Sequence, residues 1–146
     1  MAQARHRSTG GRITQLVARL IAAAGLAVNA GIHAHLADQY DVVSASISEG
    51  DLFRLEAGLA SLGVIVVLFW RHPIGDAYAW LVAAAGLFAV LLYRYDDIGA
   101  IGPLPDMYEP IWTTDKKISA ISQAVTIVVM TFLLLTRRRR KPPRAS

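Results

Sequence analysis

The sequence predicts an all-α protein, a bundle of four transmembrane helices with both chain termini in the cytoplasm. Hydrophobic residues make up 54% of the 146 residues, and the mean hydropathy of +0.40 is too high for an ordinary soluble domain. Four apolar segments each approach the roughly 20 residues that cross a hydrocarbon core of about 30 Å. Basic residues gather at the chain ends and in one turn, which is the pattern that sets membrane topology.

The first predicted helix covers residues 13–36, with its hydrophobic body in residues 20–36. Arg19 interrupts the beginning of this segment, and we expect its long side chain to extend to the lipid headgroups. Residues 1–12 contain basic, Ser, Thr and Gly residues and are predicted to form a disordered arm.

A cleaved signal peptide is the alternative for this first segment. Arg5, Arg7 and Arg12 form a basic region, an apolar stretch follows, and Val28-Asn29-Ala30 resembles a cleavage site. A mature chain would then begin near Gly31 and keep three spans. The apolar region continues past this site to residue 36, which favours an uncleaved helix, and an intact-mass measurement distinguishes the two.

The second and third predicted helices cover residues 52–70 and 76–93. Arg71-His72-Pro73 lies between them, and proline and the residue before it resist helix continuation. Because so short a turn joins them, the two helices should be antiparallel neighbours.

The fourth predicted helix covers residues 118–136 and follows "GAIGPLPDMYEP", a Gly/Pro loop without periodicity. We expect Asp115 to cap this helix. Residues 137–146 then form a basic cytoplasmic tail that stops transfer through the membrane. Its cluster can also bind anionic lipid headgroups through Arg137, Arg138, Arg139, Arg140 and Lys141.

Charge placement predicts the orientation. The arm, the short turn and the tail are basic, whereas residues 38–51 contain no lysine or arginine. The third loop is dominated by acids, with Arg94, Lys116 and Lys117 as its basic residues. The positive-inside rule therefore places both termini in the cytoplasm of a protein of the plasma membrane.

Five polar side chains should converge in the outer third of the bundle. At a rise of about 1.5 Å per residue, His33, Glu56 and Gln123 fall within two turns of the outer boundary, Asn29 lies a turn deeper, and Tyr93 is at their level. Stripes of Ala and Gly accompany them and mark helix contact faces. Because an ionisable group inside a membrane segment is costly, Glu56 indicates a functional site.

Two interpretations of this cluster remain open. Its members are either interhelical hydrogen-bond partners, with Glu56 paired to His33, Gln123 or Arg94, or ligands of a bound molecule. His33 and Glu56 are also candidate metal ligands, since imidazole and carboxylate suit zinc, iron or manganese. His35 faces away from His33 toward the headgroups, so the pair is not a two-histidine haem motif.

Several function classes lack their residues. The absence of cysteine excludes disulfides and thiolate sites. No nucleophile triad, phosphate loop or zinc-protease motif is present, so we expect neither enzymatic activity nor a cofactor. The net charge of +4 comes from the chain ends rather than from a folded basic face, so nucleic acid is not an expected partner.

The stretch from residue 31 to residue 68 resembles the uncharacterised small four-helix integral membrane proteins of actinobacterial type. In these, a Gly-Ile-His-Leu type end of the first helix is followed by a tyrosine and a Gly-x-Leu-Phe start of the second. The matching residues are Gly31, Ile32, His33, Leu36, Tyr40, Gly50, Leu52 and Phe53. Glu56 and the acidic first loop depart from that pattern. The resemblance implies the four-span topology and an uncleaved first helix, and it implies no mechanism.

The leading expectation for function is a small structural or accessory membrane subunit that packs against a membrane-protein partner or a second copy of itself. The alternative is a ligand-binding or metal-binding membrane protein that uses the polar cluster around His33 and Glu56. A proton-coupled transporter component that depends on Glu56 is the third.

Overall fold

Four long helices and one short 3₁₀ helix make up the described chain. The structure is a computed structural model that describes the backbone of residues 2–138 and the side chains of residues 10–137. The elements are α1 (Ala2–Leu36), η1 (Ala37–Tyr40), α2 (Glu49–Phe69), α3 (Pro73–Tyr95) and α4 (Thr114–Arg138). Within the described backbone, extended pairing is limited to two isolated bridges in the loops. The all-α prediction is therefore confirmed.

The helices extend beyond the apolar segments predicted from the sequence. A hydropathy pattern detects only the apolar part of a helix, so it misses polar turns at the ends. α1 begins at Ala2 rather than near residue 13, so the segment predicted to be a disordered arm is helical backbone from Ala2 onward. The first residues contain no proline and include good helix formers, which permits this extension. Of the basic tail, residues 139–146 lie outside the described residues.

Local hydrogen bonds define the starts of α2 and α4. Ser48 forms a capping box with Asp51: the Ser48 hydroxyl accepts from the Asp51 N–H at 3.0 Å, and the Asp51 carboxylate accepts from the Ser48 N–H at 3.5 Å. The prediction that Asp115 caps α4 was wrong. The Thr113 hydroxyl accepts a hydrogen bond from the Lys116 N–H at 3.2 Å and caps the helix instead. Asp115 lies in the first turn instead, where a carboxylate favours the helix dipole.

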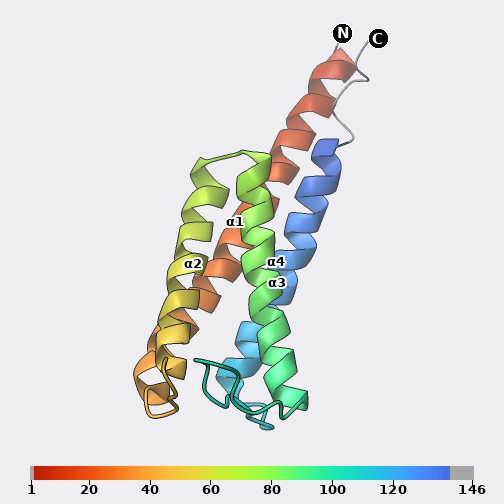
Figure 1. The fold of residues 1–146 in the computed structure, drawn as a ribbon. Helices are drawn as coiled ribbons and strands as arrows, with labels where there is room; N and C mark the ends of the chain where they lie inside the picture. The colour runs from red at the N-terminus through yellow and green to blue at the C-terminus, as the bar shows by residue number, and fades with distance from the viewer. Residues whose placement is uncertain (1, 139–146) are drawn as a thin grey trace, which may run out of the picture.

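The four helices form a closed ring of contacts. α1 packs against α2 and α4, and α3 packs against the same two helices (Figure 1). The short turn between α2 and α3 confirms them as antiparallel neighbours. This turn, the start of α1 and the end of α4 lie at one end of the bundle, called here the terminal end. Residues 37–48 and 96–113 lie at the opposite, loop end.

The core is rich in small residues, and many large apolar side chains lie on the outside of the bundle. Small residues such as Ala22, Ala60 and Ala79 are fully buried, while large apolar side chains such as Leu55 and Phe88 are exposed on the outside. Small residues at helix contacts are typical of packing in lipid. All four helices are long and apolar enough to cross a membrane, so the chain is a small multi-pass membrane protein.

Arg19 does not reach the headgroups, which corrects the prediction from sequence. It is 4% exposed, and its guanidinium donates to both carboxylate oxygens of Asp76 at 2.9 and 3.0 Å and to the Val67 carbonyl at 2.8 Å. Arg137 Nε lies 3.3 Å from the same carboxylate. This terminal ion cluster, defined as Arg19, Asp76 and Arg137, joins α1, α3 and α4 and touches the end of α2.

At the loop end, Arg54 neutralises the acidic first loop, which has no cation of its own. Its guanidinium donates to Asp38 at 2.7 Å, to Asp41 at 2.7 and 2.8 Å, and to Asp51 at 3.2 Å. The Ser48 hydroxyl also donates to Asp41 at 3.2 Å. Residues 37–48 are thereby fastened to the first turns of α2.

The loop fastening should depend on pH through Asp41. Hydrogen bonds from Arg54 lower the pKa of Asp41 below its ordinary value of 3.8, and the bond from Ser48 acts in the same direction. Because a lowered folded pKa stabilises the ionised form, this contribution is present above the ordinary pKa and is lost as the pH falls through the lowered value. Carboxyl carbon NMR titration should show the Asp41 pKa rising in Arg54→Gln but not in Lys117→Gln. An unchanged Asp41 pKa in Arg54→Gln would contradict the fastening.

Candidate functional site

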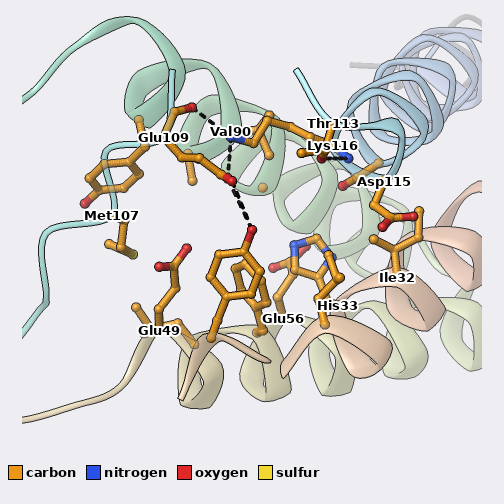
Figure 2. A pocket seen from close by; sticks show the side chains of 18 of the residues that line it. Ile32, His33, Glu49, Glu56, Val90, Met107, Glu109, Thr113, Asp115 and Lys116 are labelled. Atoms are coloured by element: carbon orange, nitrogen blue, oxygen red, sulfur yellow. Dashed lines mark hydrogen bonds and ion pairs between the residues drawn. The ribbon is translucent and has the colours of Figure 1, made fainter. Parts of the chain in front are cut away.

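A cavity of about 360 Å³ lies at the loop end, between the helices and beneath the 96–113 loop (Figure 2). All four long helices contribute to its lining. Much of the wall is apolar, with Ile32 and Leu36 from α1, Phe53 from α2, Val90 from α3 and Met107 from the loop. Ligand sites in proteins are typically of this size and of this apolar character.

One ion pair in the cavity wall, between Lys116 and Glu109, is complete within the protein. The Lys116 ammonium lies 2.7 Å from the Glu109 carboxylate and also donates to the Glu109 carbonyl at 2.9 Å. The Tyr40 hydroxyl donates to the same carboxylate at 3.2 Å. These contacts connect the loop to η1 and α4, and Figure 2 shows them along one side of the cavity.

Glu49, the first residue of α2, is a polar side chain in the wall without a protein partner. It is only 7% exposed, and its carboxylate points into the cavity (Figure 2). Among the described side chains, no ion pair or hydrogen bond is made to this carboxylate. A buried carboxylate without a partner is costly, so this group indicates that something else meets it.

Glu56 is bonded to Asn29, which is the centre of the polar network. The Asn29 amide donates to Glu56 Oε1 at 2.9 Å, and its Oδ1 accepts from Gln123 Nε2 at 2.7 Å and from the Ser119 hydroxyl at 2.8 Å. The prediction that Glu56 pairs with His33, Gln123 or Arg94 was wrong, because the hydrogen bond to its carboxylate comes from Asn29. The depth of each residue along the bundle could be estimated from the sequence. The rotation of each helix about its own axis could not, and this rotation decides which side chains face each other.

His33 lies beside this network and also lines the cavity. Its Nδ1 is 2.9 Å from the Asn29 carbonyl, and because a carbonyl oxygen can only accept, Nδ1 is the donor. The imidazole ring meets Phe53 edge-on, with ring centres 5.1 Å apart. His35 is exposed, as expected for a residue at the headgroups.

A metal ion held by His33 and Glu56 would need at least one more protein ligand, and the structure offers none among the described side chains. Within residues 10–137, no group of three or more His, Asp or Glu side chains is arranged to hold a metal ion. The two side chains also form no ion pair with each other in that part of the chain.

Tyr93 lines the cavity from α3, as predicted, and its carbonyl accepts the Glu109 N–H at 3.0 Å. Arg94 is half-buried and packs on two aromatic rings instead, with its guanidinium 5.0 Å from the Tyr95 ring centre and 5.7 Å from that of Trp112. Of the five residues expected in the cluster, His33, Glu56 and Tyr93 face the cavity. Asn29 and Gln123 lie buried behind it.

Gly86 permits the close approach of α3 to this network. A Cβ added at Gly86 would lie 2.8 Å from both Glu56 Oε1 and Gln123 Nε2. A larger residue here would displace the side-chain ends of Glu56 and Gln123, so glycine keeps these two polar groups in place beside α3.

The cavity has a side opening between α2 and α3. Ala85 and Ala89 of α3 line it and are nevertheless exposed. Figure 1 shows α2 and α3 adjacent at the terminal end and separating toward the loop end. In a bundle that spans a membrane, this opening faces the bilayer.

Several cavity residues were missed from sequence. Glu49 and Phe53 precede Glu56 by seven and three positions, so helical periodicity places all three on one face of α2 and could have identified them. No such signal identifies Glu109 and Lys116, because their positions depend on the path of an irregular loop.

Comparison of the chain with models of protein families, with curated proteins and with solved structures gives no match.

Proposed function

We propose that this protein binds a small, largely apolar molecule in the loop-end cavity of its membrane-embedded bundle. One observation carries the proposal: an apolar-walled cavity of about 360 Å³ contains the buried, unpartnered carboxylate of Glu49. A gap that served packing alone would be lined by groups that need no partner. A ligand that contacts the apolar wall and meets this carboxylate stabilises both.

Filling the cavity should remove the ligand. Ala85→Trp places an indole in the cavity, and Leu81→Trp one turn earlier on α3 is the control, since Leu81 is exposed and lies outside the lining. The protein is purified from membranes in mild detergent and studied by native mass spectrometry, with bound molecules identified after extraction. We expect a molecule bound to the natural protein and to Leu81→Trp, and at least about tenfold less in Ala85→Trp. Equal occupancy in all three proteins, or none in any, would contradict the proposal.

A second candidate function is that of an accessory subunit which packs against a transmembrane helix of another chain. It is favoured by a shallow groove on the outside of α1 and α2, lined by small residues that include Ala27, Gly31, Ala57 and Gly58. Small residues on a lipid-facing surface allow close helix approach. Crosslinking in membranes should then capture a partner that Gly58→Leu no longer binds, whereas a monomer without crosslinks in the natural protein would exclude this role.

We infer that both termini are cytoplasmic, that the membrane is the plasma membrane, and that the loop-end cavity lies near its outer face. The even number of spans and the positive-inside pattern support this orientation. Arg71 and Arg137 lie together at the terminal end, where the Arg137 guanidinium donates to the Arg71 carbonyl at 2.5 Å. In this orientation the basic tail meets the anionic cytoplasmic leaflet.

A further inference from the structure

The α2 face that lines the cavity alternates acidic and aromatic side chains. Glu49, Phe53 and Glu56 are four and three residues apart, which places them on one side of the helix. At about 1.5 Å per residue the two glutamates are separated by about 10 Å along the axis, with the Phe53 ring between them. The Tyr40 ring centre lies 4.8 Å from that of Phe53, so a second aromatic ring joins this surface.

The charges around this surface are not balanced by the protein. Four carboxylates line the cavity, from Glu49, Glu56, Glu109 and Asp115. Among the described lining residues, Lys116 is the one lysine or arginine, and Glu109 already pairs with it. In the described part of the chain, the other three carboxylates have no ion-pair partner.

We propose that the cavity takes an organic cation, a molecule with an ammonium group and an apolar body. This inference rests on the proposed function and adds the chemical class of the ligand. The ammonium lies on the Glu49–Phe53–Glu56 face, where carboxylates supply opposite charge and aromatic faces attract cations. An anionic ligand would be repelled by these carboxylates, and a neutral one would leave the buried Glu49 without a counter-charge.

The apolar wall and the side opening fit the rest of such a molecule. The body of the ligand contacts Ile32, Leu36 and Val90, which are apolar and line the cavity. Exposed Ala85 and Ala89 give an approach from the bilayer, where amphipathic cations accumulate near the headgroups. The same ammonium chemistry occurs in a free lipophilic amine and in the headgroup of phosphatidylethanolamine, so the experiment must separate these two sources.

Benzyltrimethylammonium and its uncharged carbon isostere, neopentylbenzene, test the charge requirement. Binding to delipidated full-length protein in neutral detergent is followed by saturation-transfer NMR and by equilibrium dialysis. We expect the cation to bind at least about tenfold more tightly than the isostere. Glu49→Gln and Glu56→Gln should each weaken cation binding about tenfold and leave the isostere unchanged, because the amide keeps the shape of the carboxylate without its charge.

Two further variants serve as references. Asp97→Asn removes a negative charge from an exposed loop residue outside the cavity lining, and it should leave cation affinity unchanged. Phe53→Leu keeps an apolar side chain but removes the ring, and it should weaken the cation about threefold more than the isostere. Thermal unfolding of each variant shows whether the bundle is intact. If one Gln variant is not folded, the charge requirement is tested with the other Gln variant and with the two probes on the natural protein.

The outcomes separate the class of ligand from the binding function. Equal affinity for cation and isostere, or no effect of either Gln substitution, overturns the organic-cation inference and leaves the ligand-binding function standing. No binding of either probe, while a molecule still copurifies and Ala85→Trp removes it, also overturns the inference alone. If nothing copurifies and neither probe binds, both proposals are wrong. Competition by phosphatidylethanolamine but not phosphatidylglycerol assigns the ammonium to a lipid headgroup, and absence of competition assigns it to a free amine.

Discussion

Replacing Asp76 by asparagine should lower the free energy of unfolding of the bundle by about 3 to 5 kcal/mol. Asp76 is fully buried and Arg19 is 4% exposed, and the two form a bidentate ion pair. The substitution leaves the guanidinium of Arg19 buried without its counter-charge, which is one of the costliest single changes in a protein interior. Unfolding in mixed micelles, followed by circular dichroism, measures the change.

Two controls show that the loss comes from the unpaired charge. Asp97→Asn makes the same chemical change at an exposed loop residue and should alter stability by no more than about 0.5 kcal/mol. The double variant Arg19→Met with Asp76→Leu removes both charges and should recover most of the loss. If Asp76→Asn is as stable as the natural protein, the terminal ion cluster does not hold the helices together.

Replacing Asn29 by leucine should lower the free energy of unfolding by about 2 to 3 kcal/mol. The Asn29 amide is bonded to Glu56, Gln123 and Ser119, so its loss leaves three groups without that partner. Hydrogen bonds between membrane helices contribute only about 0.6 kcal/mol on average, but unsatisfied buried groups cost about 1 to 3 kcal/mol each. The same micelle unfolding experiment measures the effect.

Thr131→Val is the matched comparison for Asn29→Leu. It removes a single interhelical bond, that from Trp80 Nε1 to the Thr131 hydroxyl at 2.9 Å, and should cost about 0.5 to 1 kcal/mol. Equal losses in the two variants would show that Asn29 is one bond among many rather than the centre of the network.

The four-helix fold could be predicted from the sequence because the bilayer requires long apolar segments, and these are visible in composition alone. The helix ends were less accessible. α4 begins at Thr114 because Thr113 caps it, while the nearby Asp115 is an equally good cap by residue type. Choosing between neighbouring caps requires the backbone conformation of the preceding loop.

The ion pair of Arg19 could not be predicted from the sequence at all. Arg19 lies near the start of the apolar segment, which permits extension to the headgroups, and its contact with Asp76, 57 residues away, fixes it inside the bundle. Both residues were visible in the sequence, but pairing them requires the rotation of α1 against α3. Long-range pairing of this kind is set by tertiary packing and leaves no local pattern.

Part of the candidate site could be predicted, because some of its residues do stand out locally in the sequence. Glu56 and Asn29 are polar residues within apolar segments, which is costly in lipid and therefore informative. The cavity itself could not be predicted, because it exists where α2 and α3 separate and where the 96–113 loop covers the space. Its volume is a property of helix splay, which no single segment encodes.

Cysteine accessibility at Ala89 tests most directly whether the loop end holds an open, acidic cavity. The chain contains no cysteine, so each single substitution gives one reactive thiol. Ala89→Cys lies in the cavity lining, Ala79→Cys in the fully buried core, and Ala100→Cys on an exposed loop. The rates of reaction with a cationic and an anionic methanethiosulfonate of similar size are compared.

An open acidic cavity predicts that Ala89→Cys reacts with the cationic reagent about tenfold faster, relative to the anionic one, than Ala100→Cys does. Benzyltrimethylammonium should slow the reaction at Ala89→Cys and leave Ala100→Cys unaffected. If Ala89→Cys is as unreactive as Ala79→Cys, or if it shows no preference for the cationic reagent, there is no open acidic cavity at the loop end.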